Sequence, residues 1–295
     1  MKKLSILLLG AAVFAAGAYE NSAAALKAGN AFRSKKQNKE AIAAYDEALK
    51  LAKHNSEKYV ACFYSGVASA GLKDYDTAVS KIRESLNYTK NGNQLSSSQY
   101  HVGHYLSIQK KYDQAIAEMG KVKELSKGVI NYYTESVPSA IGRFLMAQKK
   151  YKEAVAEAEK GVNSKRTDAS IQAWSVIYDA SLLQKDFAGA EKAVNALLSK
   201  TDLKGNDFFT RCRLANDFYR RTKKLDLSVK YAAEIENNTA LTPFQRALGV
   251  YYAAISYQSM GQKEKALEQW KKLENCSVPH LQSQAKRNIQ SLTKK

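Results

Sequence analysis

Apolar residues recur every three to four positions over long stretches of the chain, which is the period of amphipathic helices. No stretch alternates between apolar and polar residues for more than a few positions, as a half-buried strand would. Pro occurs only three times, and Ala, Lys, Leu, Glu and Gln, which favour helices, are abundant. The pattern predicts an all-α protein.

The helical pattern is repeated at a regular interval. Residues 110–119 read KKYDQAIAEM, and close counterparts stand at 73–82 (KDYDTAVSKI) and 149–158 (KKYKEAVAEA). Alignment on the small residue inside these segments gives seven positions spaced 36–39 residues apart: Ala41, Ala78, Ala115, Ala154, Ala190, Ser228 and Ala266. A repeat of about this length is typical of a solenoid, in which each unit stacks on the next.

Each repeat predicts two short antiparallel helices joined by a polar turn. A second small residue stands twelve positions before the first in five units, whereas Tyr178 and Asn216 break the series. Small side chains allow two helices to approach closely, and the aromatic or Leu residues three positions before the aligned one are expected to fill the remaining gap; these are Tyr75, Tyr112, Tyr151, Phe187 and Leu225. Each pair leaves an apolar face that the next pair must cover.

Two local patterns suggest where elements end and begin. Residues 91–99, NGNQLSSSQ, have the composition of a connecting loop. Residues 242–245, TPFQ, have the form of a capping box, with Thr before a helix, Pro at its first position and Gln three residues after the Thr.

The spacing of small and bulky residues resembles the tetratricopeptide repeat, and the first unit matches best through Gly29, Phe32, Ala41, Tyr45 and Ala48. This resemblance implies a right-handed α-solenoid of about seven helical hairpins. The repeats would span about 22–55, 59–92, 96–129, 135–168, 171–204, 209–242 and 243–276, and a capping helix would follow at about 279–293. The period exceeds the usual ~34 residues of that family, so longer connections are expected.

The first residues have the form of a secretory signal peptide. Lys2 and Lys3 precede an apolar run over residues 4–17, and residues 16–18 read AGA, a small-x-small cleavage signal. We expect cleavage after Ala18, export to the periplasm or extracellular space, and no stable membrane insertion afterwards. An uncleaved membrane anchor is the alternative, although the run is shorter than the ~20 residues that span a bilayer.

The chain has a formal net charge of +18, which favours anionic partners such as acidic proteins or cell-wall polymers. Acidic residues are interspersed among the basic ones, so no arm for nucleic acid stands out and nucleic acid is not an expected partner. A solvated basic surface without a dedicated partner is the alternative.

Catalytic and metal motifs are not found. The sequence has no G-x-S-x-G elbow, no H-E-x-x-H and no phosphate-binding Gly-rich loop, so neither an enzyme nor a cofactor is expected. His101 and His104 lie one helical turn apart but lack a third ligand, so no metal site is expected. Cys62 and Cys212 are expected as buried free thiols, and a bridge between Cys212 and Cys276 stays open.

In the tetratricopeptide family, the first helices of the repeats line a concave groove that holds the ligand. By this resemblance the partner-binding candidates are Asn30, Arg33, Tyr100, His104, Arg143, Arg213, Arg220, Arg221 and Tyr251, with Asp179 and Asp217 beside them. The family's clamp for chaperone carboxyl termini does not match, since Leu26 and Tyr64 stand at two of its positions.

Residues 211–221, RCRLANDFYRR, are the best candidate for contact with an acidic ligand, because Arg binds carboxylates bidentately. The alternative is an intrahelical ladder in which Asp217 neutralises Arg213 and Arg221.

We therefore expect an exported protein–protein interaction scaffold that holds a peptide or partner protein in its groove as part of a cell-envelope complex, and the positive charge favours an acidic partner. The alternative function is a carbohydrate- or peptidoglycan-binding module, which the Tyr and Arg residues and the positive charge favour.

Overall fold

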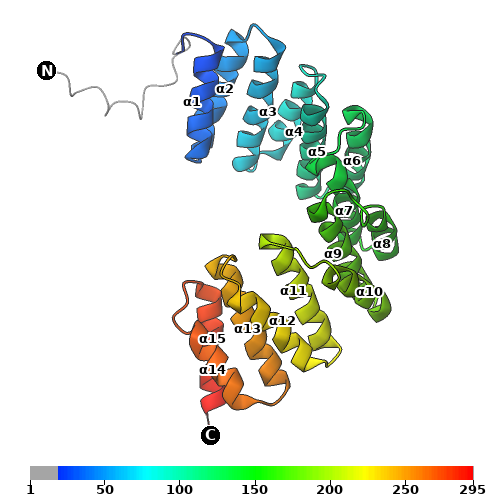
Figure 1. The fold of residues 1–295 in the computed structure, drawn as a ribbon. Helices are drawn as coiled ribbons and strands as arrows, with labels where there is room; N and C mark the ends of the chain where they lie inside the picture. Colours follow the sequence, from blue (N-terminus) through cyan, green and yellow to red (C-terminus); the bar gives the residue numbers. More distant parts are fainter. Residues whose placement is uncertain (1–18, 295) are drawn as a thin grey trace, which may run out of the picture. The chain divides into compact units, whose positions relative to one another are not determined.

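The computed structural model describes residues 19–294, so the predicted signal peptide lies outside the described residues. The described chain contains fifteen α-helices and no strand, which confirms the all-α prediction (Figure 1). It divides into two compact units; unit 1 ends at Lys150 and unit 2 begins at Tyr151. Unit 1 contains α1 (Ser22–Ser34), α2 (Asn38–Leu51), α3 (Asn55–Gly71), α4 (Tyr75–Leu86), α5 (Gly92–Ile108), α6 (Tyr112–Ser126) and α7 (Tyr132–Ala147).

Unit 2 continues the same pattern from the second half of the fourth expected repeat. It contains α8 (Tyr151–Glu159), α9 (Thr167–Leu183), α10 (Phe187–Leu198), α11 (Gly205–Arg221), α12 (Leu225–Asn237), α13 (Pro243–Ser259), α14 (Lys263–Leu273) and α15 (Pro279–Thr293). Within each unit, a helix packs mainly against its neighbours in sequence, as stacked hairpins do. The last helix, α15, packs on α14 and places the buried Ala285 in the same cluster as Trp270.

The small residues bring the two helices of a hairpin into close contact. A Cβ added to Gly66 would lie 2.9 Å from the carbonyl oxygen of Ala78, and one added to Gly103 would lie 3.1 Å from that of Ala115. In the sixth repeat the same two positions hold polar residues. There the Asn216 side-chain amide donates hydrogen bonds to the carbonyl oxygen of Ser228 at 2.7 Å and to its hydroxyl at 2.8 Å. Hydrogen bonds thus replace the close van der Waals contact.

The expectation about the gap-filling aromatic residues holds only in part, since Tyr75 and Tyr112 do pack against the core cluster of unit 1. Phe187 is 50% exposed, and the tyrosines in the same register are only partly buried. These residues begin the second helix of each hairpin, where only one side of the helix end is covered. The large buried side chains instead stand four residues after the small one; they are Tyr45, Ile82, Met119 and Trp270.

The loop predicted over residues 91–99 is mostly helix. The Asn91 side chain caps α5 by accepting hydrogen bonds from the backbone of Asn93 and Gln94. Ser96 and Ser98 are fully buried, and the Ser96 hydroxyl donates to the backbone oxygen of Asn93. The composition suggested a loop, but these serines lie inside the core, where a hydroxyl such as that of Ser96 finds a hydrogen-bond partner in the protein. The capping box at Thr242 is confirmed, since Thr242 and Gln245 each bond to the other's backbone N–H.

Six of the hairpin turns place a lysine in the left-handed backbone region. The φ angles lie between 60° and 66° at Lys36, Lys73, Lys110, Lys149, Lys185 and Lys223, and the seventh turn has Gly261 with φ 72°. In the second hairpin, Lys73 N–H donates to Ala70 O at 2.9 Å and Asp74 N–H to Ser69 O at 3.0 Å. This pattern ends a helix, and glycine is the residue that adopts it without steric cost.

Replacing Lys73 with Gly is expected to stabilise unit 1 by about 0.5–1 kcal/mol, because the left-handed conformation then loses its steric cost. The exposed Lys123, in the last turn of α6 but with helical backbone, provides the control: there the same replacement should destabilise by up to about 1 kcal/mol, the penalty for Gly in a helix. Thermal unfolding of the full chain measures both. A loss of stability in both variants would show that the Lys73 side chain offsets the steric cost.

Candidate functional site

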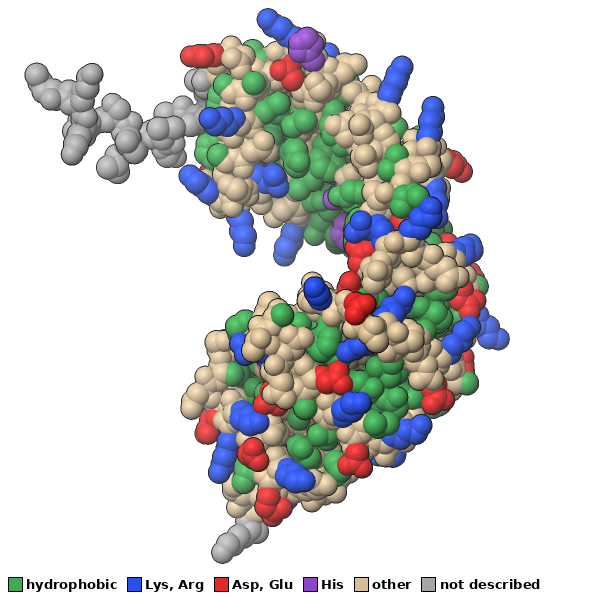
Figure 2. Space-filling model, in the orientation of Figure 1, with side chains coloured by type: hydrophobic (Ala, Val, Ile, Leu, Met, Phe, Trp, Pro, Cys, Tyr) green, Lys and Arg blue, Asp and Glu red, His purple; other side chains and the backbone are tan. Residues whose placement is uncertain are grey.

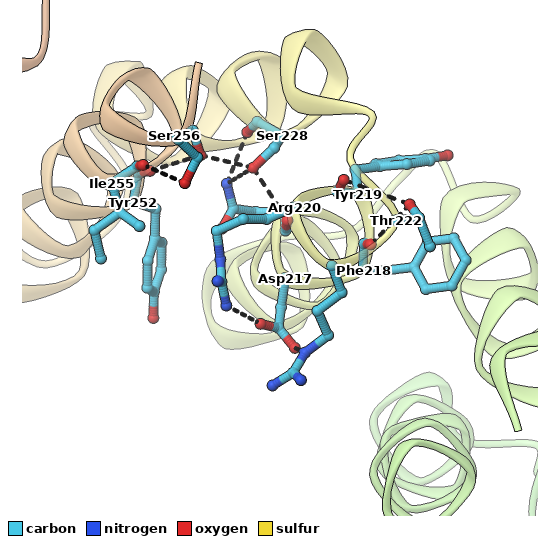
Figure 3. Close-up of polar contacts among 12 residues, drawn as sticks. Asp217, Phe218, Tyr219, Arg220, Thr222, Ser228, Tyr252, Ile255 and Ser256 are labelled. Atoms are coloured by element: carbon cyan, nitrogen blue, oxygen red, sulfur yellow. Dashed lines mark hydrogen bonds and ion pairs between the residues drawn. The ribbon is translucent and has the colours of Figure 1, made fainter. Parts of the chain in front are cut away.

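A pocket lies in unit 2 between α11 and α13, the first helices of the sixth and seventh expected repeats. Its volume is about 360 Å³, and its lining residues are Arg213, Asn216, Asp217, Arg220, Tyr251, Tyr252 and Ile255. Three of the predicted partner-binding residues therefore meet here: Arg213, Arg220 and Tyr251. Figure 3 shows Arg220, Asp217 and Tyr252 projecting to the same side of the two helices.

Helical periodicity explains why these residues share one surface. Arg213, Asp217 and Arg220 stand at intervals of four and three on α11, so they form one stripe. The opposite stripe of α11 is buried through Cys212, Leu214, Ala215 and Phe218. Helix α12 packs against both α11 and α13 and holds them at a fixed spacing.

Asp217 connects three side chains at the edge of the pocket. Its carboxylate accepts hydrogen bonds from Arg220 at 2.7 Å, from Arg221 Nε at 2.7 Å and from the hydroxyl of Tyr178 on α9 at 2.8 Å. Burial tends to raise the pKa of Asp217, but the hydrogen bonds from Arg221 and Tyr178 and the charges of both arginines outweigh it and lower the pKa. Asp217 therefore stays ionised near neutral pH.

Arg213 is the cation of the pocket without a partner. It is half-buried, and within residues 19–294 it forms no hydrogen bond or ion pair. Asp217 thus pairs with Arg220 and Arg221 but not with Arg213, which leaves the predicted ladder half complete. Burial raises the pKa of Tyr252, against the opposing charge of Arg213, so the Tyr252 hydroxyl remains a neutral hydrogen-bond donor.

A second group of candidates lies in unit 1, along a row of aromatic rings on α3, α5 and α7. The Arg33 guanidinium lies 4.6 Å from the centre of the Tyr64 ring. Ring centres then follow one another at 5.2–5.6 Å through Tyr64, Phe63, His101, Tyr133 and Tyr100. We call these five rings and the neighbouring Tyr132 the aromatic row. On the face of unit 1 that Figure 2 shows, hydrophobic side chains gather over the middle of the unit.

The other candidates of unit 1 lie near this row. Asn30 accepts a hydrogen bond from the Tyr45 hydroxyl at 2.8 Å, and Arg143 is exposed. His104 is exposed, and its ring centre lies 5.6 Å from that of Tyr105. Burial, reinforced by Tyr132, raises the pKa of Tyr100 to about 12.

The described residues contain no group of three or more His, Cys, Asp or Glu placed to hold a metal ion. Burial lowers the pKa of His101, and partial desolvation of the ring together with the charge of His101 lowers the pKa of His104, although part of that side chain reaches solvent; both shifts favour neutral imidazoles. All three cysteines are free thiols, and burial raises the pKa of Cys62 and of Cys212 to about 12. None of the helices in residues 19–294 combines the length and apolar character needed to span a membrane.

The comparisons with known proteins identify the repeat. Residues 22–55, the first expected repeat, match the model of the tetratricopeptide repeat family. A tetratricopeptide repeat protein from Parabacteroides merdae superposes with a TM-score of 0.57 at 13% identity, covering 92% of this chain and 99% of that one. Residues 22–55 thus match one tetratricopeptide repeat, and the described chain has the fold of tetratricopeptide-repeat proteins.

Two further solved structures share the fold. The C-terminal part of one from Cytophaga hutchinsonii has a TM-score of 0.54 at 17% identity and covers 90% of this chain and 99% of its own. PilW, a type IV pilus biogenesis factor, has a TM-score of 0.52 at 14% identity and covers 75% of this chain and 94% of its own. No curated protein matches by sequence. The tetratricopeptide fold is typically a non-catalytic scaffold for protein–protein interaction.

Sequence reasoning missed four residues of the site. Tyr178 and Asn216 were visible only as breaks in the series of small residues, and both breaks mark side chains that form hydrogen bonds around α11. Tyr252 and Ile255 stand one and four positions after the predicted Tyr251, on neighbouring parts of α13. The spacing along α13 could have indicated them.

Proposed function

We propose that this protein is an exported scaffold that holds an extended peptide or partner protein, acidic at its point of contact, within a cell-envelope complex. The observation that carries the proposal is the pocket between α11 and α13, where Arg213 has no hydrogen-bond or ionic partner among residues 19–294. Arg is suited to carboxylates because it donates several hydrogen bonds in a planar arrangement.

Three observations support the cell-envelope setting. Residues 1–18 have the form of a signal peptide, and the net charge of +18 favours an acidic partner. Among proteins with this fold, PilW is described as a pilus biogenesis factor, which makes envelope assembly a reasonable setting to test first.

Partner capture in the native envelope tests the proposal. Cross-linking of the wild-type protein is compared with that of Arg213→Glu and of Arg287→Glu, a matched control on the exposed surface of α15. Reversal of the charge in the pocket should reduce capture of an acidic partner by about tenfold or more, whereas the control should capture it as the wild type does. Equal capture by all three proteins would show that the pocket does not contribute to partner binding.

Export has its own measurement. The amino terminus of the protein recovered from the envelope should be Tyr19, as mass spectrometry would show. Recovery of a chain that begins at Met1 from the cytoplasmic fraction alone would overturn export.

A second candidate function is binding to peptidoglycan, and the aromatic row in unit 1 favours it. Tyr64, Tyr100 and Tyr133 are only partly buried and Tyr132 is 38% exposed, so flat ring surfaces with polar tips remain available to a sugar chain. Co-sedimentation of the full chain with purified peptidoglycan tests this function. If the protein binds peptidoglycan through the aromatic row, the wild type should sediment with it and Tyr132→Ala should sediment less. A wild-type protein that stays in solution would rule out this second function.

A further inference from the structure

We infer that the pocket between α11 and α13 selects a single carboxylate that is joined to an apolar group. The inference rests on the proposed function, because it specifies which part of the partner the pocket would hold. It also makes a claim of its own about ligand charge, which can be tested without the partner.

The charges that line the pocket leave room for one negative charge. The lining contains two cations, Arg213 and Arg220, and one anion, Asp217. Arg220 already donates to Asp217 at 2.7 Å, and Arg221, outside the lining, shares the same carboxylate, so both guanidiniums have an ionic partner within the protein. Arg213 is left as the one uncompensated cation of the lining residues. A carboxylate neutralises that charge, whereas a phosphate monoester brings a charge of about −1.5 to −2.

Asp217 is held in place and acts against a second negative charge. Tyr178, which is only 1% exposed, and Arg221 both donate to its carboxylate from outside the pocket lining. These bonds fix the orientation of the carboxylate and keep it ionised. Any further anionic group on a ligand at Arg213 would face this carboxylate and be repelled.

The remaining walls specify the neutral part of the ligand. Ile255 and the rings of Tyr251 and Tyr252 provide apolar surface, and the Tyr252 hydroxyl provides a neutral donor. Tyr251 is held by Trp270, with ring centres 5.6 Å apart, and its hydroxyl accepts a hydrogen bond from Gln284 at 3.3 Å. The volume of about 360 Å³ lies at the small end of ligand pockets, which suits one or two side chains.

Two parts of a protein partner have this chemistry: a carboxyl terminus that ends in an apolar residue, and an Asp or Glu side chain beside an apolar residue. Small probes distinguish them. N-acetyl-phenylalanine represents the first and N-acetyl-glutamyl-phenylalaninamide the second. N-acetyl-phenylalaninamide has the same apolar group without charge, and phenyl phosphate carries the larger charge.

Calorimetric titration of the full chain with these probes tests the inference. At least one of the two carboxylate probes should bind about tenfold or more tightly than both the neutral amide and phenyl phosphate. The better of the two identifies the source of the carboxylate. Equal affinity for carboxylate and amide, stronger binding of phenyl phosphate, or no binding of either carboxylate would overturn the inference.

Variants locate the binding and test the role of Asp217. Arg213→Gln should lower the affinity for the carboxylate to that for the amide, while Arg287→Gln on α15 should bind as the wild type does. Asp217→Asn should reduce the preference for carboxylate over phenyl phosphate, since the repelling charge is gone; an unchanged preference would contradict that role. Because the probe comparison uses the wild-type protein, the inference stays testable even if a variant does not fold.

This experiment and partner capture can fail separately. Carboxylate binding with no loss of partner in Arg213→Glu would retain the selectivity and reject the proposed function. Loss of the partner in Arg213→Glu without selective probe binding would support the proposed function and reject the selectivity for a carboxylate.

Discussion

Replacing Trp270 with Ala is expected to lower the free energy of unfolding of unit 2 by about 3–5 kcal/mol, the range for removal of a buried aromatic side chain. Trp270 is 1% exposed and is among the largest fully buried side chains of the described chain. Its indole N–H donates to Oε1 of the partly buried Gln258 at 3.0 Å, so the substitution creates a cavity and also removes the donor of that acceptor.

The same substitution should also affect the pocket. The Trp270 ring packs edge-on against Tyr251, which forms one pocket wall, so its loss removes the support of that wall. Affinity for a carboxylate probe should therefore fall together with stability.

Denaturant unfolding followed by circular dichroism measures the effect, and Phe187→Ala in α10 provides the control. Phe187 is 50% exposed, so its removal should change the free energy of unfolding by no more than about 0.5 kcal/mol. Similar losses in the two variants would show that burial does not decide which aromatic side chain supports the repeat.

Adding one methyl group at Gly249 is expected to destabilise unit 2 by about 1–3 kcal/mol. A Cβ at this position would lie 2.6 Å from the backbone nitrogen of Glu236 and 2.8 Å from the carbonyl oxygen of Ala232. Both contacts are with the backbone of α12, which cannot move aside as a flexible side chain could. Helices α12 and α13 must therefore separate, and the spacing that forms the pocket changes.

Gly120, inside α6, provides a control at which the same substitution should raise stability. A Cβ there would meet nothing within 4 Å, and the position is exposed. Gly120→Ala should stabilise unit 1 by about 0.5–1 kcal/mol through helix propensity alone. Thermal unfolding of both variants should move in opposite directions; a stabilising Gly249→Ala would show that α12 and α13 are not held together as tightly as the structure has them.

The regular part of the fold could be read from the chain because it depends on local pattern. The 36–39-residue interval and the small residues twelve positions apart are sufficient to predict hairpins that stack, since an isolated hairpin cannot cover its apolar face. The first repeat, residues 22–55, also carries enough of the family pattern to match its model.

Burial within a hairpin was harder to predict, because a helix pattern indicates a face but not how deeply each position on it is covered. Phe187 and Trp270 both stand on core-facing registers, yet Phe187 is 50% exposed and Trp270 is buried. The difference arises from position along the helix: Phe187 begins α10, whereas Trp270 lies inside α14 beneath α15.

By itself, the sequence determined the helical class, the repeat and the set of arginines on α11. The tertiary structure decided which of those arginines lacks a partner. Spacing along α11 allows Asp217 to pair with Arg213, Arg220 or Arg221 alike. Tyr178, which lies 39 residues away on α9, donates to the same carboxylate oxygen of Asp217 that Arg221 contacts. Only the packing of α9 against α11 brings Tyr178 and Asp217 together, and it is this contact that helps hold Asp217 with Arg220 and Arg221 and leaves Arg213 available in the pocket.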